Sequence, residues 1–230
     1  MANLLLIESA TEMCSVAVAT DGQLVSLEER RLDNLSDHSR LLSPLIETAL
    51  SRAAYGFEQL HAVAVSKGPG SYSSLRSGVS LAKGICYALD IPLIGVDTLR
   101  SLAHAAAQRV GDPSAAYVPM IDARRMEVYA AVFDAQTNER QAPAPHILTA
   151  EWVDALLDKY PSLVVCGNGA RKIHHVYQGE RVLVLDLVCS AAHLLPIAHE
   201  AFVQKKFEDL AYFVPVYLKP PHITTPRKKI

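Results

Sequence analysis

The chain has 230 residues, of which half are hydrophobic and a fifth are charged, with a formal net charge of −2 at pH 7. This composition is typical of a chain that buries a full core, and it gives the body of the protein no electrostatic reason to bind nucleic acid. Charged residues interrupt every apolar run before the roughly 18 residues that a membrane span needs, and residues 1–7 lack the cationic flank of a signal peptide. We therefore expect a soluble, cytoplasmic protein without membrane contact.

The first half of the chain predicts three strands followed by alternating helices and strands. Apolar runs at residues 4–8, 14–20 and 23–30 are separated by short polar turns, which predicts an antiparallel meander. From residue 37 the apolar spacing changes to three and four, which predicts a helix over residues 37–54. The pattern then predicts a strand at 61–66, a helix over 71–89 capped by Ser71, a strand at 91–96 and a helix over 99–110.

The second half begins as the first does. Residues 121–134 resemble residues 7–21, because each segment has an apolar strand that ends in an acid, a short polar turn and a second apolar strand. This similarity predicts an internal duplication. The first two strands should cover residues 117–122 and 126–133. Later elements are expected as helices over 151–159 and 190–204 and as strands over 163–167, 182–187 and 213–218.

Two linked meanders with helical crossovers predict an α/β fold, the duplicated actin-like (ribonuclease H-like) layout with two mixed sheets. Residues 1–110 should form the N-terminal subdomain and residues 111–218 a reduced C-terminal subdomain. Residues 219–230, rich in proline, should be a flexible tail.

The cysteines and histidines do not have the spacing of a metal site. The four cysteines lie far apart in apolar segments without a C-x-x-C pair, so we expect small buried side chains; they are Cys14, Cys86, Cys166 and Cys189. Neither the adjacent His174-His175 pair nor His193 with His199 has the helical spacing of three or four that a shared metal requires.

Two features at the start of the chain could carry chemistry. Glu8 ends the first strand, where nucleotide-binding members of the actin and sugar-kinase superfamily hold phosphate and metal, so its carboxylate could hold water or magnesium. It could equally accept the N–H groups of its own hairpin. The loop Gly68-Pro69-Gly70-Ser71 opens a helix and could bind an anion, but it lacks the lysine of a P-loop, so a structural role is favoured.

Small residues form a stripe along the helix over 71–89. Ser74, Gly78 and Ala82 are spaced by four, which allows another element to approach closely. Gly78 and Gly84 each cost about 1 kcal/mol of helix propensity relative to alanine. The stripe could pack on the protein's own sheet or on a helix of a partner chain.

Four stretches and a C-terminal motif together resemble one protein family, the TsaB (YeaZ) family of threonylcarbamoyladenosine biosynthesis proteins. The stretches are Ile7-Glu8-Ser9-Ala10-Thr11-Glu12-Met13-Cys14-Ser15-Val16-Ala17, His38-Ser39-Arg40 through Pro44, Gly68-Pro69-Gly70-Ser71-Tyr72-Ser73-Ser74-Leu75-Arg76-Ser77-Gly78 and Asp122-Ala123-Arg124-Arg125-Met126-Glu127-Val128-Tyr129, followed by Pro215-Val216-Tyr217-Leu218. The third stretch is the most specific, although Ser73-Ser74 stands where Thr-Gly is more usual in this family.

The resemblance implies a non-catalytic dimerisation subunit for an enzyme that transfers threonylcarbamoyl to the adenosine next to the anticodon of tRNA. The implied partners are the catalytic paralogue TsaD, the ATPase TsaE and a second copy of the chain when it is alone, with tRNA contacted only through the complex. ATP and magnesium would bind only in the assembled complex, with no tightly bound cofactor and no metal. The partner interface would contain Leu41, Leu45, Ser74, Leu75, Gly78, Leu81 and Ala82. The residues open to a nucleotide or anion are Glu8, Gly68, Gly70, Ser71, Arg124 and Arg125.

Two substitutions favour the absence of catalytic residues. Where the catalytic paralogue has a His-x-x-x-His metal pair, this chain has Thr98 and Leu102, which cannot replace two imidazoles. Where the paralogue has a Gly-Gly turn that admits phosphate, this chain has Ala123-Arg124-Arg125, although two arginines could themselves hold an anion.

Two other functions stay open. One is an enzyme of the same superfamily, either an ATP-dependent small-molecule kinase or a metalloprotease-like protein. The other is direct tRNA binding through Arg124, Arg125 and the basic tail residues Arg227-Lys228-Lys229.

Overall fold

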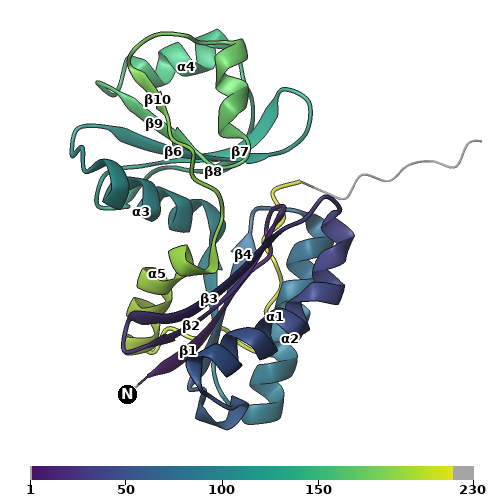
Figure 1. The fold of residues 1–230 in the computed structure, drawn as a ribbon. Helices are drawn as coiled ribbons and strands as arrows, with labels where there is room; N and C mark the ends of the chain where they lie inside the picture. The colour runs from purple at the N-terminus through teal and green to yellow at the C-terminus, as the bar shows by residue number, and fades with distance from the viewer. Residues whose placement is uncertain (1, 220–230) are drawn as a thin grey trace, which may run out of the picture.

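Two five-stranded sheets, one from each half of the chain, form the framework of the computed structural model, which describes residues 2–219 (Figure 1). The first sheet has the strand order β3-β2-β1-β4-β5. Its strands are β1 (Asn3–Glu8), β2 (Met13–Thr20), β3 (Gln23–Arg31), β4 (Ala62–Gly68) and β5 (Leu93–Asp97). β1 pairs antiparallel with β2 and parallel with β4, so the carboxyl ends of β1, β4 and β5 lie at one edge.

The second sheet has the same topology as the first. Its order is β10-β9-β6-β7-β8, with β6 antiparallel to β7 and parallel to β9. Its strands are β6 (Ala116–Asp122), β7 (Glu127–Phe133), β8 (Glu139–Ile147), β9 (Leu163–Cys166) and β10 (Val182–Val184). Read in chain order, both sheets are arranged 3-2-1-4-5, which confirms the predicted duplication and the actin-like fold.

Helices cover both faces of each sheet. In the first lobe, α1 (His38–Ala53) and α2 (Tyr72–Leu89) lie side by side on one face, with the short helices η1 (Leu35–Asp37) and η2 (Phe57–Gln59) in the connections. In the second lobe, α4 (Ala150–Leu157) and the 3-10 helix η3 (Ala170–His175) share a core with one face of the sheet. Apolar residues at 42, 45, 46, 49, 50 and 53 form the buried side of α1, as its spacing predicts.

The last helix of each half crosses to the opposite lobe. α3 (Thr98–Val110) follows β5 but packs mainly on the second sheet, where Leu99, Leu102 and Ala106 meet Tyr117 and Val164. α5 (Ala191–Val203) follows the second sheet but packs on the first, where Leu194 and Ala198 share a core with Leu4, Leu6 and Ile94. Figure 1 shows α3 under the upper lobe and α5 on the lower one. This exchange joins the two lobes through buried apolar contacts.

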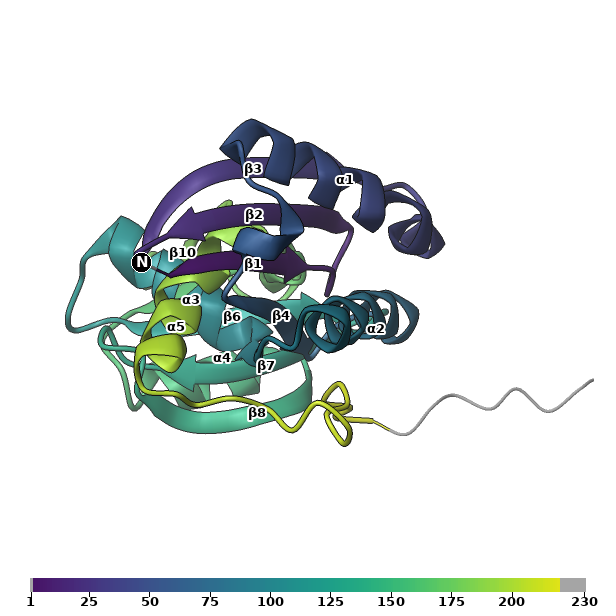
Figure 2. The same ribbon diagram turned by 90° about the horizontal axis from the view of Figure 1, so that it is seen from below.

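After α5 the chain forms a segment that we call the C-terminal strap, residues 206–219. Glu208 donates its N–H to Leu93 at the edge of β5, and Val216 donates its N–H to Lys67. Lys83 of α2 donates to the carbonyl groups of Ala211 and Phe213. Figure 2 shows the strap passing under the first lobe from α5 toward α2. The strap thus ties the end of α5 to β4, β5 and α2.

Three predictions about individual elements were wrong or incomplete. Residues 213–218 do not form a strand; they belong to the strap, where single hydrogen bonds from Lys83 to the Phe213 carbonyl and from the Val216 N–H to Lys67 stand in place of a strand ladder. β8 was missed, because Pro143 and Pro145 and its polar residues hide the strand pattern. Ser71 is the N-cap residue of α2 by position, but its hydroxyl bonds to the Ser74 hydroxyl and caps no backbone N–H.

The predictions for the cysteines and for the reduced second half are confirmed. All four cysteines are buried and free. The reduction of the second half lies in the short β9 and β10 and in η3, a 3-10 helix where the first half has the long helix α2. Within residues 2–219, no helix combines the length and the apolar character that crossing a bilayer requires. The predicted boundary at residues 110 and 111 falls between α3 and β6, and each sheet takes its strands from one side of it, but α3 and α5 each pack on the lobe of the other half. The expected tail, apart from Lys219, lies outside the described residues.

Candidate functional site at the facing hairpins

The ends of β1 and β6 bring the two duplicated hairpins to the boundary between the lobes. Each hairpin begins with an acid, Glu8 in the first and Asp122 in the second. A side-chain hydrogen bond links this region across the lobes: Asn168, just after β9, donates to Glu12 in the first hairpin over 2.7 Å. Asn168 also accepts the N–H of Asp122. Both hairpins therefore belong to one polar network.

Glu8 is fully buried and bonded within its own hairpin. Its Oε1 accepts the backbone N–H of Ala10 over 2.6 Å, while Oε2 has no partner among the described residues. Burial raises the pKa of Glu8 to about 7, against the opposing effect of the hydrogen bond from the Ala10 N–H. Of the two predicted roles, the structure shows the hairpin contact for Oε1.

The Gly68 to Ser71 loop is packed on two sides. The N–H of Ser71 donates to the Ala10 carbonyl over 2.7 Å, and a Cβ at Gly70 would lie 2.4 Å from that same oxygen. On the other side, a Cβ at Gly68 would lie 2.8 Å from the Val216 carbonyl of the strap, and the φ of Gly68 is +106°. The glycines allow these close approaches. The N–H of Ser71 is occupied, so the loop has the structural role that the sequence favoured.

In the second hairpin, the equivalent acid, Asp122, is exposed and forms an ion pair. Asp122 accepts the N–H of Arg124, and its carboxylate forms an ion pair with Lys172 of η3 over 2.6 Å. Arg124 and Arg125 have φ values of +70° and +50°, so both occupy the left-handed region, which glycine adopts without strain. Their side chains are exposed and form no ion pair with any described residue.

These hairpins do not fit a magnesium-bound nucleotide. Magnesium takes carboxylate and water oxygens in an open octahedral site, but Glu8 has no exposed surface and Asp122 is paired with Lys172. Residues 2–219 contain no group of three or more histidine, cysteine, aspartate or glutamate side chains arranged for a metal ion. Thr98 and Leu102, which the family resemblance sets against a metal pair of the catalytic paralogue, are both fully buried.

Most of the predicted partner-interface residues lie in the protein's own core. Leu45, Ser74, Leu75 and Ala82 are buried, and a Cβ at Gly78 would lie 2.3 Å from the Ser9 hydroxyl. This corrects the expectation for those five residues, because the small stripe lets α2 approach β1 and β4 of its own lobe and not a partner helix. Leu41 and Leu81 are partly buried and pack against the same core.

The features expected of a partner surface lie on the solvent-facing side of α2 and not on its buried stripe of small residues. A Cβ at Gly84 would meet nothing within 4 Å, so the fold gives no reason for a glycine there. Tyr87, near the helix end, is 82% exposed. Tyr72, at the other end, stacks on Tyr217 of the strap with ring centroids 4.8 Å apart, and Arg76 lies over the Tyr72 ring.

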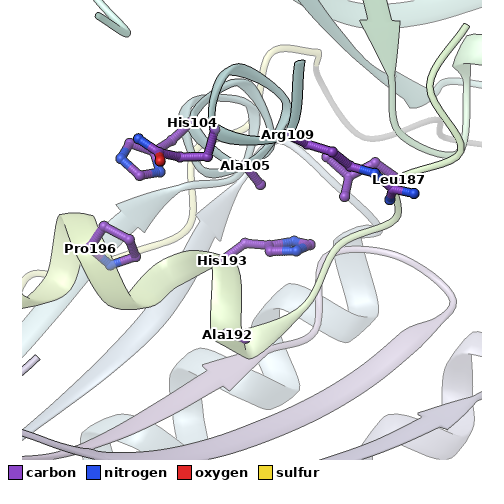
Figure 3. Close-up of a pocket in the computed structure, with 8 residues that line it drawn as sticks. His104, Ala105, Arg109, Leu187, Ala192, His193 and Pro196 are labelled. Atoms are coloured by element: carbon purple, nitrogen blue, oxygen red, sulfur yellow. The ribbon is translucent and has the colours of Figure 1, made fainter. Parts of the chain in front are cut away.

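Two hollows among the described residues lie away from these hairpin residues. One, of about 410 Å³, lies between the exchanged helices, with His104 and Arg109 from α3 and His193 from α5 in its wall (Figure 3). Burial lowers the pKa of both histidines. The other, of about 390 Å³, lies near Asp97 and the β7–β8 turn.

The sequence analysis missed three residues whose side chains connect the two hairpins to each other or to η3. They are Glu12, Asn168 and Lys172. Each acts through a partner far away in the chain, and pairs of that kind leave no local spacing pattern. For Asn168, the sequence offered one signal, the glycine-flanked turn Gly167-Asn168-Gly169. Its glycines let the turn pack closely, since a Cβ at Gly167 would lie 2.4 Å from the Met120 carbonyl.

Comparison with known proteins places this arrangement in a family. Residues 34–225 match the family model described as TsaD, tRNA N6-adenosine threonylcarbamoyltransferase. The chain is 28% identical over 225 residues to the tRNA threonylcarbamoyladenosine biosynthesis protein TsaB of Escherichia coli, covering 94% of each chain. It is 30% identical over 188 residues to TsaB of Bacillus subtilis, covering 80% of each chain.

A solved structure agrees with these relatives. The structure of YeaZ from Pseudomonas aeruginosa superposes with a TM-score of 0.78 at 27% identity, covering 95% of this chain and all of that one. The chain therefore belongs to the TsaD family and, within it, to the TsaB (YeaZ) type of proteins.

Proposed function

We propose that this chain is a non-catalytic dimerisation subunit of the cytoplasmic complex that transfers threonylcarbamoyl to adenosine next to the anticodon of tRNA. The family membership supports a place in that modification. The hairpins support the lack of catalysis, because Glu8 is buried, Asp122 is paired with Lys172, and Arg124-Arg125 replaces a glycine turn. The catalytic partner would be TsaD, with the ATPase TsaE joining the assembly. ATP and magnesium are assigned to the assembled complex and not to this chain's own hairpins.

The partner surface in this proposal is the outer face of α2 with the exposed side of α1. Gly84 carries the argument: a glycine inside a helix costs about 1 kcal/mol relative to alanine, and nothing within this chain approaches it. A partner helix that packs closely there would account for it. The exposed aromatic ring of Tyr87 supplies apolar area on the same helix. A second copy of the chain would use this surface when the partner is absent.

Mixing the purified chain with its catalytic partner tests the proposal. We expect a one-to-one complex by size-exclusion chromatography with light scattering, and threonylcarbamoylation of tRNA only when both proteins are present. Gly84→Glu should fold normally, because the new side chain points into open space, and should abolish both the complex and the activity. Ala155→Glu, on the exposed side of α4 in the other lobe, is the matched control and should change neither.

Different failures have different meanings. An intact complex with Gly84→Glu would rule out the α2 surface. Turnover of ATP or peptide by the chain alone, or stoichiometric zinc, would support the kinase-like or metalloprotease-like alternative and contradict the non-catalytic role.

A further inference from the structure

The exchanged helices α3 and α5 leave a hollow of about 410 Å³ between them, which we call the α3–α5 hollow (Figure 3). The two helices contact each other, but small side chains line the hollow, Ala105 from α3 and Ala192 from α5. Leu187 and Pro196 complete its apolar walls. The volume lies within the roughly 300–1,000 Å³ that is usual for sites of small organic molecules. The hollow is therefore large enough to hold such a molecule.

Polar side chains of α3 border the same hollow with unused hydrogen-bond donors. Within the described part of the chain, His104 and Gln108 form no hydrogen bond through their side chains. Arg109 donates one bond, over 3.5 Å to the Asp186 carbonyl, and has no acidic partner among residues 2–219. The Asp186 carboxylate pairs with Arg171 instead. The five donors of the Arg109 guanidinium group thus remain largely available, in the planar arrangement that matches a carboxylate or a phosphate.

The facing helix, α5, has no free N–H group at its start for an anion. The N–H groups of its first turn are already bonded to the Ser15 hydroxyl and to the hydroxyl and carbonyl of Ser190. Pro196, inside α5, has no N–H to donate to the carbonyl of Ala192, so that carbonyl lacks its usual partner in the helix. An anion in the hollow would therefore be held by Arg109, and α5 would supply an acceptor and apolar surface.

The two histidines in the wall supply ring surface and not charge. Burial lowers the pKa of His104 and of His193 below the ordinary histidine value, so both rings are mostly neutral at pH 7. The acids that interact with them are Glu200 and Glu29, respectively. Neither acid is among the ion-pair partners of Arg109 in residues 2–219. The Arg109 end of the hollow is therefore the end at which a negative group is favoured.

We propose that the α3–α5 hollow binds a small organic anion, with its carboxylate or phosphate group on Arg109 and its apolar body between Ala105 and Ala192. The anionic group uses the free donors of Arg109, and the amide of Gln108 adds a neutral donor. The apolar body removes alanine and proline surface from water. This site goes beyond the proposed function, because it shares no residue with the α2 surface. Its ligand would contact both α3, which packs on the second sheet, and α5, which packs on the first.

Titration of the complete chain with anilinonaphthalene sulfonate tests the site. This fluorescent probe joins an anionic group to apolar rings, and its emission rises in apolar surroundings. Arg109→Gln removes the charge, and Ala105→Trp fills the space; neither position is buried, so both variants should fold. The matched controls are Lys159→Gln and Ala155→Trp, on the exposed side of α4 in the second lobe. Circular dichroism checks the fold of each protein.

We expect one saturable site per chain in the parent and in both controls. Arg109→Gln should weaken binding about tenfold, which is the effect of losing one charge-assisted hydrogen bond. Ala105→Trp should abolish saturable binding, because the indole ring occupies the place of the probe. Arg109→Lys should recover part of the affinity, since it keeps the charge and loses the planar pair of donors.

Competition against the bound probe identifies the anionic group of the natural ligand. Phenyl phosphate and benzoate have the same apolar ring, so stronger displacement by phenyl phosphate indicates a phosphate ligand and stronger displacement by benzoate indicates a carboxylate. Benzyl alcohol is the neutral comparison and should displace little. Equal displacement by all three compounds would contradict the role of Arg109.

The inference is overturned if the parent shows no saturable binding, or if Arg109→Gln binds the probe as tightly as the parent does. If Ala105→Trp fails to fold, Arg109→Gln still decides, because its side chain is exposed. The result is independent of the proposed function, since absence of a complex with the catalytic partner would refute that function and leave probe binding by the chain alone unchanged.

Discussion

The two hairpins that begin the two halves of the chain occupy equivalent places in sheets of identical topology. The acidic side chains of the two hairpins nevertheless have opposite environments. The first hairpin buries Glu8 and bonds it to its own backbone. The second exposes Asp122 and neutralises it with Lys172 from another element. The first hairpin lies against Gly70 of the loop before α2 and against Gly78 of α2, while the second has the exposed Arg124-Arg125 turn.

This difference indicates which parts of a duplicated fold can change in sequence. The apolar strands must keep their register because a shift by one residue would turn every core side chain toward solvent. The turns carry no such constraint. A turn that is covered by a helix tolerates only small residues around it, and a turn that faces solvent can accept arginine.

The largest effect should come from the contact between α2 and the first hairpin. Gly78→Glu forces a carboxylate into space already filled by Ser9 and Val65, so it should lower the free energy of unfolding by about 4 kcal/mol or more. Thermal and urea unfolding followed by circular dichroism measure this loss. Gly84→Glu, the same change on the open face of the same helix, should stay within about 1 kcal/mol of the parent. Similar losses for both variants would contradict the assignment of the two faces.

The second effect concerns the buried acid of the first hairpin. Because the pKa of Glu8 is raised from 4.5 to about 7 on folding, the folded state holds its proton more tightly. Stability should therefore be greatest below pH 4.5 with respect to this group, and should fall as the pH rises through 7, by on the order of 3 kcal/mol.

Glu8→Gln removes that titration. We expect it to stabilise the chain by about 2 kcal/mol at pH 8 and to change little at about pH 3.5, where the parent's Glu8 is largely protonated in both the folded and the unfolded state. Urea unfolding at a series of pH values is the measurement. An unchanged pH profile in the variant would show that another group is responsible.

The smallest effect belongs to the second hairpin. Arg124→Gly should raise the stability by about 1 kcal/mol, because glycine adopts the left-handed conformation without the clash of a Cβ. Ala123→Gly, at the neighbouring position without positive φ, is the control and should lower stability slightly, since it only adds freedom to the unfolded chain. If both glycine variants shift the urea midpoint in the same direction, backbone strain is not the cause.

The sequence by itself determined the fold class and the duplication, because strand and helix periods are local properties and the repeat of an apolar strand, an acid and a turn is visible in the chain. It also placed nearly every helix, since apolar residues at spacings of three and four mark one face. It missed β8, whose two prolines and partly exposed residues weaken the alternation on which strand prediction depends.

Only the tertiary structure decided which surface each residue faces. The stripe of Ser74, Gly78 and Ala82 could have met a partner or the protein's own sheet, and spacing is the same in both cases; the contact with Ser9 settles it. The ion pair of Lys219 with Glu127 likewise brings Lys219 close to the turn between β6 and β7, although 92 residues separate the two partners. Contacts of this kind depend on how the two lobes pack, which no local pattern in the chain encodes.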